Sequence, residues 1–173
     1  ANFFDRVIGL DFSESFIKAA NKIKRQGFLK YKYLEEGDTF GQGTVRCPEH
    51  SDKVSFVVGD ACDLPNEWRG FDLVHAANLI CRLPDPQVLL GRLPALVRVG
   101  GQLLLATPFT WLEEFTPKDK WIGNGNSAQA LEEALSPHFK LEKSVDLPFV
   151  IREHRRKFQF SVSLGTRWRR VKD

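Results

Sequence analysis

The chain has 173 residues, of which 42% are hydrophobic and 27% charged, and its formal net charge is +3. A chain of this length suits one domain and can bury a sizeable core. The small net charge does not demand a nucleic-acid partner, although residues 152–157 and 167–170 are locally basic. No run approaches the roughly 20 apolar residues that span a bilayer, and no signal peptide is visible, so we expect a cytoplasmic location.

Cysteine usage fits the same compartment. The three cysteines, Cys47, Cys62 and Cys81, form no C-x-x-C pair, and their odd number does not suggest a disulfide framework. Cys47 and His50 make a C-x-x-H that could hold a metal, but no second pair follows. The simpler interpretation is a loop cysteine beside a surface histidine, and we expect no metal site.

The first half of the chain alternates strand and helix patterns. Residues 6–11 and 54–58 are short apolar runs typical of buried strands. Between them, Ser13 and Gly27 are placed to cap a helix at its start and end. Residues 28–52 form an irregular insertion, predicted to contain a hairpin arm at residues 29–33 and then a flexible loop around the glycines at 37, 41 and 43.

The second half continues the alternation and then changes. Residues 71–80 and 101–108 predict two further strands, with a helix between them that has Asp85 as N-cap and is interrupted by Pro94. Another helix is expected from Ser127 to about Pro137. Residues 139–147 and 157–168 predict two strands close in sequence, and in the second we expect alternate side chains to face the core: Phe158, Phe160, Val162 and Leu164.

Helix-separated strands followed by a closing pair indicate an α/β sandwich. Parallel strands need crossover helices, whereas neighbouring strands with a short connection pair antiparallel. The sequence therefore predicts a Rossmann-like sheet that is mostly parallel, with an antiparallel strand pair at its C-terminus, formed by residues 1–173 as a single domain.

Polar side chains follow several of these strands, where ligands of such sheets bind. Asp11 could accept hydrogen bonds from both hydroxyls of a ribose, or it could be an acid favoured by the start of the following helix. Asp60 could accept from an exocyclic amine such as that of adenine, while the small Ala61 and Cys62 line the flat ring. Asn78 follows the third strand.

These motifs resemble those of class I S-adenosylmethionine-dependent methyltransferases. The phrases "GDACDLP", "FDLV" and a "GG" before "LLLATP" occur here in the order and spacing of that superfamily. A nicotinamide-binding protein also has an acid after its second strand, but that alternative explains neither the GDA turn nor the closing strand pair. The resemblance implies S-adenosylmethionine as cofactor, and for this chain it suggests a set of binding residues: Asp11, Phe12, Asp60, Ala61, Cys62 and Asn78.

A narrower resemblance covers nearly the whole chain. "DFSESFIKAA", "YKYLEEG", "AANLICRLPDP" and "TPFTWLEEFTPKDKWIG" are similar to the C-terminal methyltransferase domain of ovothiol biosynthesis enzymes, the 4-mercaptohistidine N1-methyltransferase family. The resemblance implies methylation of an imidazole nitrogen of a thiol-histidine, a small-molecule substrate, with neither nucleic acid nor membrane as partner. It also implies a covalently linked upstream region, an iron-dependent sulfoxide synthase. Cys81 departs from the family, which has an aspartate there.

A second departure concerns the start of the chain. Residue 1 opens within an apolar phrase, and the glycine-rich loop and first strand of the class I fold are missing. In that fold the first strand lies between the strands represented here by residues 6–11 and 71–77. Its absence would leave backbone groups unpaired inside a sheet, which is costly. We therefore expect an N-terminally truncated segment of a larger enzyme.

The loop at residues 107–123 is the main candidate for binding the methyl acceptor. Phe109 and Trp111 could wall the substrate ring, and Glu113 or Glu114 could pair with the substrate ammonium or hold an imidazole N–H. Alternatively, the aromatic side chains form a satellite hydrophobic cluster under a long loop. The resemblance favours function, so we predict catalytic residues Glu113 and Glu114.

Three residues outside this loop complete the predicted site. Arg82 could meet a substrate carboxylate bidentately, or it could be a surface arginine. Arg152 and His154 precede the last strand, and a histidine can accept a proton near neutral pH, although a lone loop histidine is usually inert. We predict a catalytic role for His154 and substrate contacts for Arg82, Phe109, Trp111 and Arg152.

Two other functions stay open. One is a class I methyltransferase acting on another small amino-acid-like substrate. The other is a non-catalytic module that keeps the fold but serves as an interaction surface; the missing glycine loop favours it, whereas Asp11, Asp60 and the aromatic loop argue against it.

Overall fold

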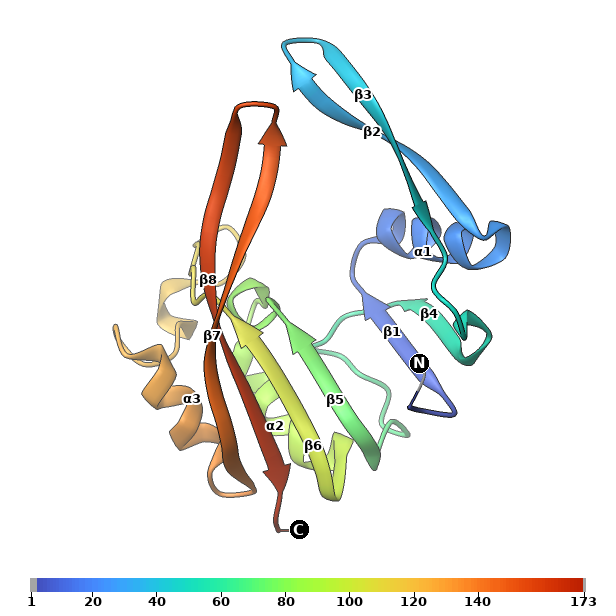
Figure 1. Cartoon of the computed structure of the whole chain (residues 1–173). Helices are drawn as coiled ribbons and strands as arrows, with labels where there is room; N and C mark the ends of the chain where they lie inside the picture. The colour runs from blue at the N-terminus through green and yellow to red at the C-terminus, as the bar shows by residue number, and fades with distance from the viewer. Residues whose placement is uncertain (1–2, 173) are drawn as a thin grey trace. The chain divides into compact units, whose positions relative to one another are not determined.

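A computed structural model of the protein describes residues 3–172, and its chain forms two compact units (Figure 1). Unit 1 comprises the described residues up to Asp63 together with Ile151–Gln159. Unit 2 comprises Leu64–Val150 and the described residues from Phe160 onward.

Unit 1 is built around two parallel strands and a helix. Strand β1 (Val7–Asp11) pairs with β4 (Val54–Val58), with Asp11 opposite Val58. Helix α1 (Glu14–Gln26) starts where the Ser13 hydroxyl accepts a hydrogen bond from the N–H of Phe16, and it ends at Gly27, whose φ of 79° is the left-handed cap that glycine adopts without strain. Both predicted caps are confirmed.

The insertion in unit 1 is a regular hairpin rather than a flexible loop. Strands β2 (Phe28–Glu36) and β3 (Thr39–Arg46) pair antiparallel, and Gly41 and Gly43 lie inside β3. Each glycine lies under an aromatic ring of the opposite strand: a Cβ on Gly41 would come within 2.6 Å of the Tyr33 ring, and one on Gly43 within 2.5 Å of the Tyr31 ring. The prediction of a loop was wrong because these glycines make room for cross-strand rings.

Unit 2 holds the larger sheet, in the order β5-β6-β8-β7. Strands β5 (Phe71–Ala77) and β6 (Val97–Thr107) run parallel, and β6 pairs antiparallel with β8 (Lys157–Arg170), whose first three residues belong to unit 1. Strand β7 (Phe139–His154) completes the sheet and forms a long hairpin with β8. The α/β fold with an antiparallel strand pair at its C-terminus is thus confirmed.

Two helices of unit 2 cover one face of this sheet, and α2 (Pro86–Leu96) lies behind β5 and β6 in Figure 1. The second is α3 (Ser127–Leu135), and short 3-10 helices occur at η1 (Ser51–Lys53), η2 (Ile80–Arg82) and η3 (Lys118–Lys120). The core lies between this sheet face and the two helices. It is formed by buried residues of β6, β8, α2 and α3: Leu89, Leu93, Leu103, Leu105, Leu131, Leu135 and Trp168.

Element boundaries in unit 2 differ from prediction in three places. Helix α2 continues through Pro94, which lies two residues before the last helical residue, Leu96, so the hydrogen bond that proline cannot donate is lost only in the last turn. Helix α3 is capped by Asn126, whose side chain accepts from the N–H of Gln129, so Ser127 is the first helical residue. Strand β5 ends at Ala77, because Asn78 has a φ of 52°.

The predicted core face of β8 was also wrong. Phe158 and Phe160 are exposed, the latter by 69%, whereas Ser163 is only 2% exposed and Trp168 1%. The two phenylalanines lie on the part of the hairpin near its turn, where alternation alone does not lead to burial. Burial begins at Ser163, next to the segment Leu164–Arg169 that pairs with β6.

Within residues 3–172, no helix combines the length and the apolar composition that membrane crossing requires.

Candidate functional site

Unit 1 brings its two predicted strand-end carboxylates to the same end of one small sheet. Strands β1 and β4 are parallel neighbours, and the N–H of Gly59 donates to the carbonyl of Asp11 (3.1 Å), which ties the two strand ends together. Asp11 ends β1, and Asp60 lies two residues beyond β4. The predicted pairing of these acids at one sheet edge is therefore present in the structure.

Each carboxylate is fixed by its own turn. The Oδ1 of Asp11 accepts from the N–H of Ser13 (2.8 Å), and the Oδ1 of Asp60 accepts from the N–H of Cys62 (2.7 Å). Such side-chain-to-backbone bonds two residues on set the direction of the carboxylate. In each residue one oxygen holds the turn, and the other is left to accept hydrogen bonds from a ligand.

The neighbours of these acids are of the predicted types. Phe12 is 80% exposed, although large aromatic side chains are usually buried. Ala61 is buried, and Cys62 is half-buried. An exposed aromatic ring and a small buried side chain beside two carboxylates suit a flat, polar-edged ligand.

In unit 2, two left-handed residues follow neighbouring parallel strands. Asn78 after β5 has a φ of 52° and donates its N–H to the carbonyl of Ala106 (2.6 Å). Phe109 after β6 has a φ of 50°, and its N–H donates to the hydroxyl of Thr107 (3.2 Å). Positive φ at non-glycine residues is uncommon and concentrates at functional sites.

Arg82 fastens the loop after β6 to η2. Its guanidinium donates to the carbonyl (2.5 Å) and the hydroxyl (3.1 Å) of Thr110 and to the carbonyl of Cys81 (2.9 Å). It also lies over the ring of Phe115, 5.1 Å from the ring centre. These bonds use guanidinium N–H groups that were predicted to bind a substrate carboxylate. A substrate role for Arg82 therefore stays a prediction.

The aromatic loop is held by internal hydrogen bonds. Trp111 and Trp121 stack with ring centres 6.3 Å apart, and their indole N–H groups donate to the hydroxyl of Ser127 (3.0 Å) and the carbonyl of Thr116 (2.7 Å). Thr116, fully buried, donates to the carbonyl of Leu83 (2.7 Å). The loop thus has a fixed conformation that presents part of Trp111 and Phe109 to solvent.

The predicted catalytic glutamates lie on the exposed side of this loop. Glu113 pairs with Lys118 at 3.1 Å, and both side chains are more than half exposed. Glu114 is exposed as well. A second ion pair, between Lys120 and Asp85 (2.9 Å), ties the loop to the start of α2, and this hydrogen bond holds the pKa of the Asp85 carboxyl below its usual value and that of Lys120 above it.

Arg152 and His154 lie at the end of β7, in the part of the strand that belongs to unit 1, and Arg152 contacts strand β2. Arg152 pairs with Glu35 at 2.8 Å and lies 4.7 Å from the centre of the Tyr33 ring. The Nδ1 of His154 accepts from the N–H of Arg156 (3.2 Å). Arg152 is therefore engaged by β2, and the functional roles of both residues stay predictions.

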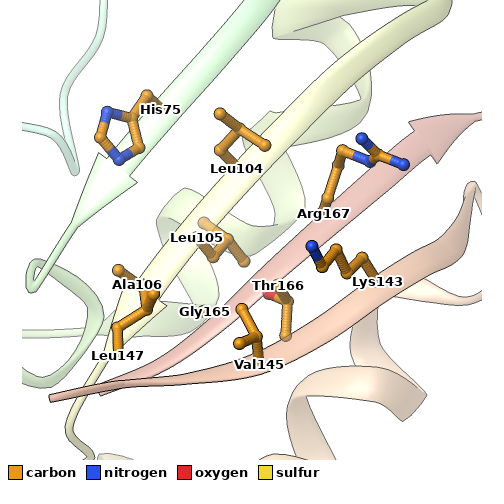
Figure 2. Close-up of a pocket in the computed structure, with 10 residues that line it drawn as sticks. All are labelled: His75, Leu104, Leu105, Ala106, Lys143, Val145, Leu147, Gly165, Thr166 and Arg167. Atoms are coloured by element: carbon orange, nitrogen blue, oxygen red, sulfur yellow. The ribbon is translucent and has the colours of Figure 1, made fainter. Parts of the chain in front are cut away.

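A pocket of about 260 Å³ lies on the face of the large sheet opposite α2 (Figure 2). Its floor is apolar, with Leu104 of β6 and Val145 and Leu147 of β7, and the side chains of Lys143 and Arg167 stand at one end. No predicted site residue lines it. Among residues 3–172, no three His, Cys, Asp or Glu side chains are grouped to hold a metal ion, and Cys47 is a free thiol.

Sequence reasoning missed three hydroxyl side chains that hold the strand ends of unit 2: Thr107, Thr110 and Ser163. Ser163 of β8 donates to the Oδ1 of Asn78 at 2.7 Å. The two residues are 85 positions apart, and no local pattern links them. Only the pairing of β8 with β6 brings them together.

The chain is similar in sequence to known methyltransferases. Residues 1–105 match the protein family described as "Methyltransferase domain". The chain is 36% identical over 80 residues to methyltransferase str2 of Strobilurus tenacellus, an alignment that covers 43% of this chain and 29% of the relative. The chain thus spans under a third of that relative's length.

Solved structures of similar fold cover most of the chain. A SAM-dependent methyltransferase from Methanosarcina mazei matches 97% of this chain and 83% of its own, with a TM-score of 0.62 and 14% identity. The N-methyltransferase NodS from Bradyrhizobium japonicum, solved with S-adenosyl-L-homocysteine, matches 95% of this chain and 66% of its own, with a TM-score of 0.55 and 12% identity. These likenesses establish the fold.

Proposed function

The chain belongs to the methyltransferase-domain family, and on this premise we propose that it methylates an imidazole nitrogen of a thiol-histidine, giving ovothiol, with S-adenosylmethionine as methyl donor. The observation that carries the cofactor assignment is the pair of carboxylates Asp11 and Asp60 on adjacent parallel strands, each with one oxygen engaged in its own turn. Thiol-histidine as acceptor rests on the sequence resemblance and the aromatic loop.

The residues of unit 1 fit the adenosine part of the cofactor. A carboxylate that ends a strand can accept hydrogen bonds from the two hydroxyls of a ribose, and we assign this role to Asp11. Asp60 accepts from the adenine amino group, and Phe12 and Ala61 flank the flat ring. The turn bonds to Ser13 and Cys62 hold both carboxylates in place before the ligand arrives, which lowers the cost of binding.

When bound, S-adenosylmethionine supplies an electrophilic methyl group. The contribution of the protein is then to position the acceptor nitrogen and to exclude water. We assign the walls of the acceptor site to Trp111 and Phe109, since the stacking of Trp111 on Trp121 fixes its ring. Glu113 or Glu114 pairs with the acceptor ammonium or takes the proton that the ring loses, with His154 as the other candidate base.

We propose further that these residues are part of a longer polypeptide. The two-stranded sheet of unit 1 and the four-stranded sheet of unit 2 each have a parallel strand, β1 or β5, with a free edge. The apolar pocket floor of Leu104, Val145 and Leu147 adds an uncovered sheet face to unit 2 (Figure 2). Preceding polypeptide could pair with the free edge of β5 and cover this apolar floor. In this proposal, an iron-dependent sulfoxide synthase region lies further upstream.

Methyl transfer to thiol-histidine tests the proposal directly. The intact protein is incubated with methyl-labelled S-adenosylmethionine and thiol-histidine, with histidine and other amino acids as comparison acceptors, and the product is identified by mass spectrometry. We expect labelled ovothiol. Transfer only to another amino acid would contradict the acceptor assignment but keep the activity, and cofactor binding without transfer to any acceptor would support an interaction module.

A further inference from the structure

The exposed residue Asn78 is held through its side chain by a buried residue of β8, Ser163. Its Oδ1 accepts a hydrogen bond from the hydroxyl of Ser163 at 2.7 Å, and Ser163 is 2% exposed. The Asn78 backbone is fixed as well, by its N–H bond to Ala106 at 2.6 Å and by its φ of 52°. Both the main chain and the side chain of this residue are therefore set before any ligand binds.

In the structure the carboxamide has one orientation, with its Oδ1 toward the hydroxyl of Ser163. The last torsion of an asparagine side chain has a broad, roughly two-fold preference, so an unrestrained carboxamide can present either its oxygen or its NH2 group to a ligand. A hydroxyl can donate to Oδ1, and this bond leaves the NH2 group on the opposite side. Asn78 is thereby a hydrogen-bond donor at the end of β5.

We propose that Ser163 is a positioning residue, which turns the Asn78 carboxamide so that its NH2 group donates to an acceptor atom of the bound cofactor. This inference rests on the proposed function with S-adenosylmethionine as cofactor, for which the sequence predicts Asn78 as a binding residue. Ser163 is buried and does not touch the ligand itself. A hydroxyl also holds the residue after the neighbouring strand β6, since the hydroxyl of Thr107 accepts a hydrogen bond from the N–H of Phe109, which has a positive φ.

The contact also has a purely structural explanation, which makes different predictions. A buried hydroxyl needs a hydrogen-bond partner, and Asn78 would supply one whether or not a ligand binds. On that account, loss of the contact lowers stability and leaves cofactor affinity unchanged. On ours, cofactor affinity falls, and a variant that keeps the hydroxyl restores it.

The test compares variants of the intact protein by calorimetric titration with S-adenosyl-L-homocysteine and by thermal unfolding. Ser163→Ala should weaken binding about five- to tenfold, the effect of one neutral hydrogen bond. Ser163→Thr keeps the hydroxyl and should return affinity to within about twofold of the parent. Ser161→Ala, on the same face of β8 two residues away, is the matched control and should bind like the parent.

Two variants at Asn78 keep the test decisive if Ser163→Ala fails to fold. Asn78→Gly removes the carboxamide and tolerates positive φ, and Asn78→Asp keeps an acceptor for Ser163 but replaces the NH2 donor by an oxygen. We expect both to lose about tenfold in affinity or more. Parent affinity in Asn78→Gly, or in Ser163→Ala with only a lowered Tm, would overturn the inference, whereas failure of the proposed function itself would appear as no binding by the parent protein.

Discussion

The strand ends of the two units use their polar side chains in different ways. In unit 1, Asp11 and Asp60 are each fixed by one local backbone bond and keep an oxygen for a ligand. In unit 2, Arg82, Trp111 and Asn78 are fixed by partners distant in the sequence, which use much of their hydrogen-bonding capacity. Local turns thus hold the proposed cofactor contacts Asp11 and Asp60, whereas tertiary contacts hold the candidate residues of unit 2.

The largest expected change in cofactor affinity comes from covering the free strand edge of β5. Residues 1–173 alone should bind S-adenosyl-L-homocysteine at least about 100-fold more weakly than a longer polypeptide that covers β5 and the pocket floor, because an open strand edge and an uncovered apolar floor stabilise the binding conformation less; this difference corresponds to about 2.7 kcal/mol. Calorimetry and thermal melts compare the two proteins. Hydrogen exchange at β5 and around Leu104 should slow in the longer protein.

Equal affinity and equally cooperative unfolding of the two proteins would contradict the proposal of a longer enzyme. The strand-end carboxylates of unit 1 would then be sufficient for binding without further polypeptide.

The next largest effect should come from the carboxylate of Asp11. A charge-assisted hydrogen bond contributes roughly 1.5–3 kcal/mol, so Asp11→Ala should weaken cofactor binding by about ten- to a hundredfold. Asp38→Ala, an exposed acid in the turn between β2 and β3, is the control for lost charge. Unchanged calorimetric affinity in a folded Asp11→Ala protein would remove Asp11 from the site.

The strand-end residues of unit 1 were easier to predict from the sequence than those of unit 2, for a physical reason. Ser13, Gly27 and Asp85 act on residues two to four positions away, so their roles as caps follow from local sequence and are confirmed. The positions of Asp11 and Asp60 after β1 and β4 also follow from local sequence, because each comes after a short apolar run, and their roles in binding stay predictions. Apolar periodicity also predicted an α/β fold with a C-terminal antiparallel strand pair.

The contacts of unit 2 could not be predicted in this way. Ser163 meets Asn78 across 85 positions, and Arg82 meets Thr110 across 28. Alternation in β8 indicated a buried Phe160, yet burial depends on pairing with β6, which starts later in the strand. The local pattern predicts which side chains lie on the same face of a strand. Tertiary packing decides whether that face is buried.

The glutamates of the aromatic loop should have a smaller effect than Asp11. Glu113 and Glu114 are exposed, so solvent screens their charges and an ion-paired contact with the acceptor falls at the weak end of its range. We expect Glu113→Gln or Glu114→Gln to lower kcat/KM for thiol-histidine about tenfold, with the other nearly silent and cofactor affinity unchanged in both. Glu113 already pairs with Lys118, which favours Glu114 as the sensitive position.

Trp111→Ala extends this test to the wall of the proposed acceptor site. The substitution removes the stacking on Trp121 and the indole bond to Ser127, so thermal unfolding must be measured beside turnover. Parent rates of thiol-histidine methylation in all three variants would show that the loop has only a structural role.

The smallest expected effect concerns the ion pair that ties this loop to α2. Asp85→Asn keeps the N-cap, since asparagine caps as well as aspartate, but removes the charge that pairs with Lys120 at 2.9 Å. Because the pair is exposed, Tm at neutral pH should fall by no more than about 2 °C, and Asp85→Ala, which also loses the cap, should fall further.

The pH dependence of this difference follows from the sign of each pKa shift. The pKa of Asp85 lies below its ordinary value of 3.8 because Lys120 donates to it, so its stabilisation is present above that value and is lost as pH falls through the lower folded pKa. The pKa of Lys120 lies above 10.5 because of the same bond, so its stabilisation is lost as pH rises beyond that. The Tm difference between the parent and Asp85→Asn should therefore be constant from about pH 5 to 9 and vanish at both extremes. A difference that persists unchanged at a pH below the folded pKa of Asp85 would mean that the asparagine disturbs the cap itself and that the ion pair contributes nothing to holding the loop.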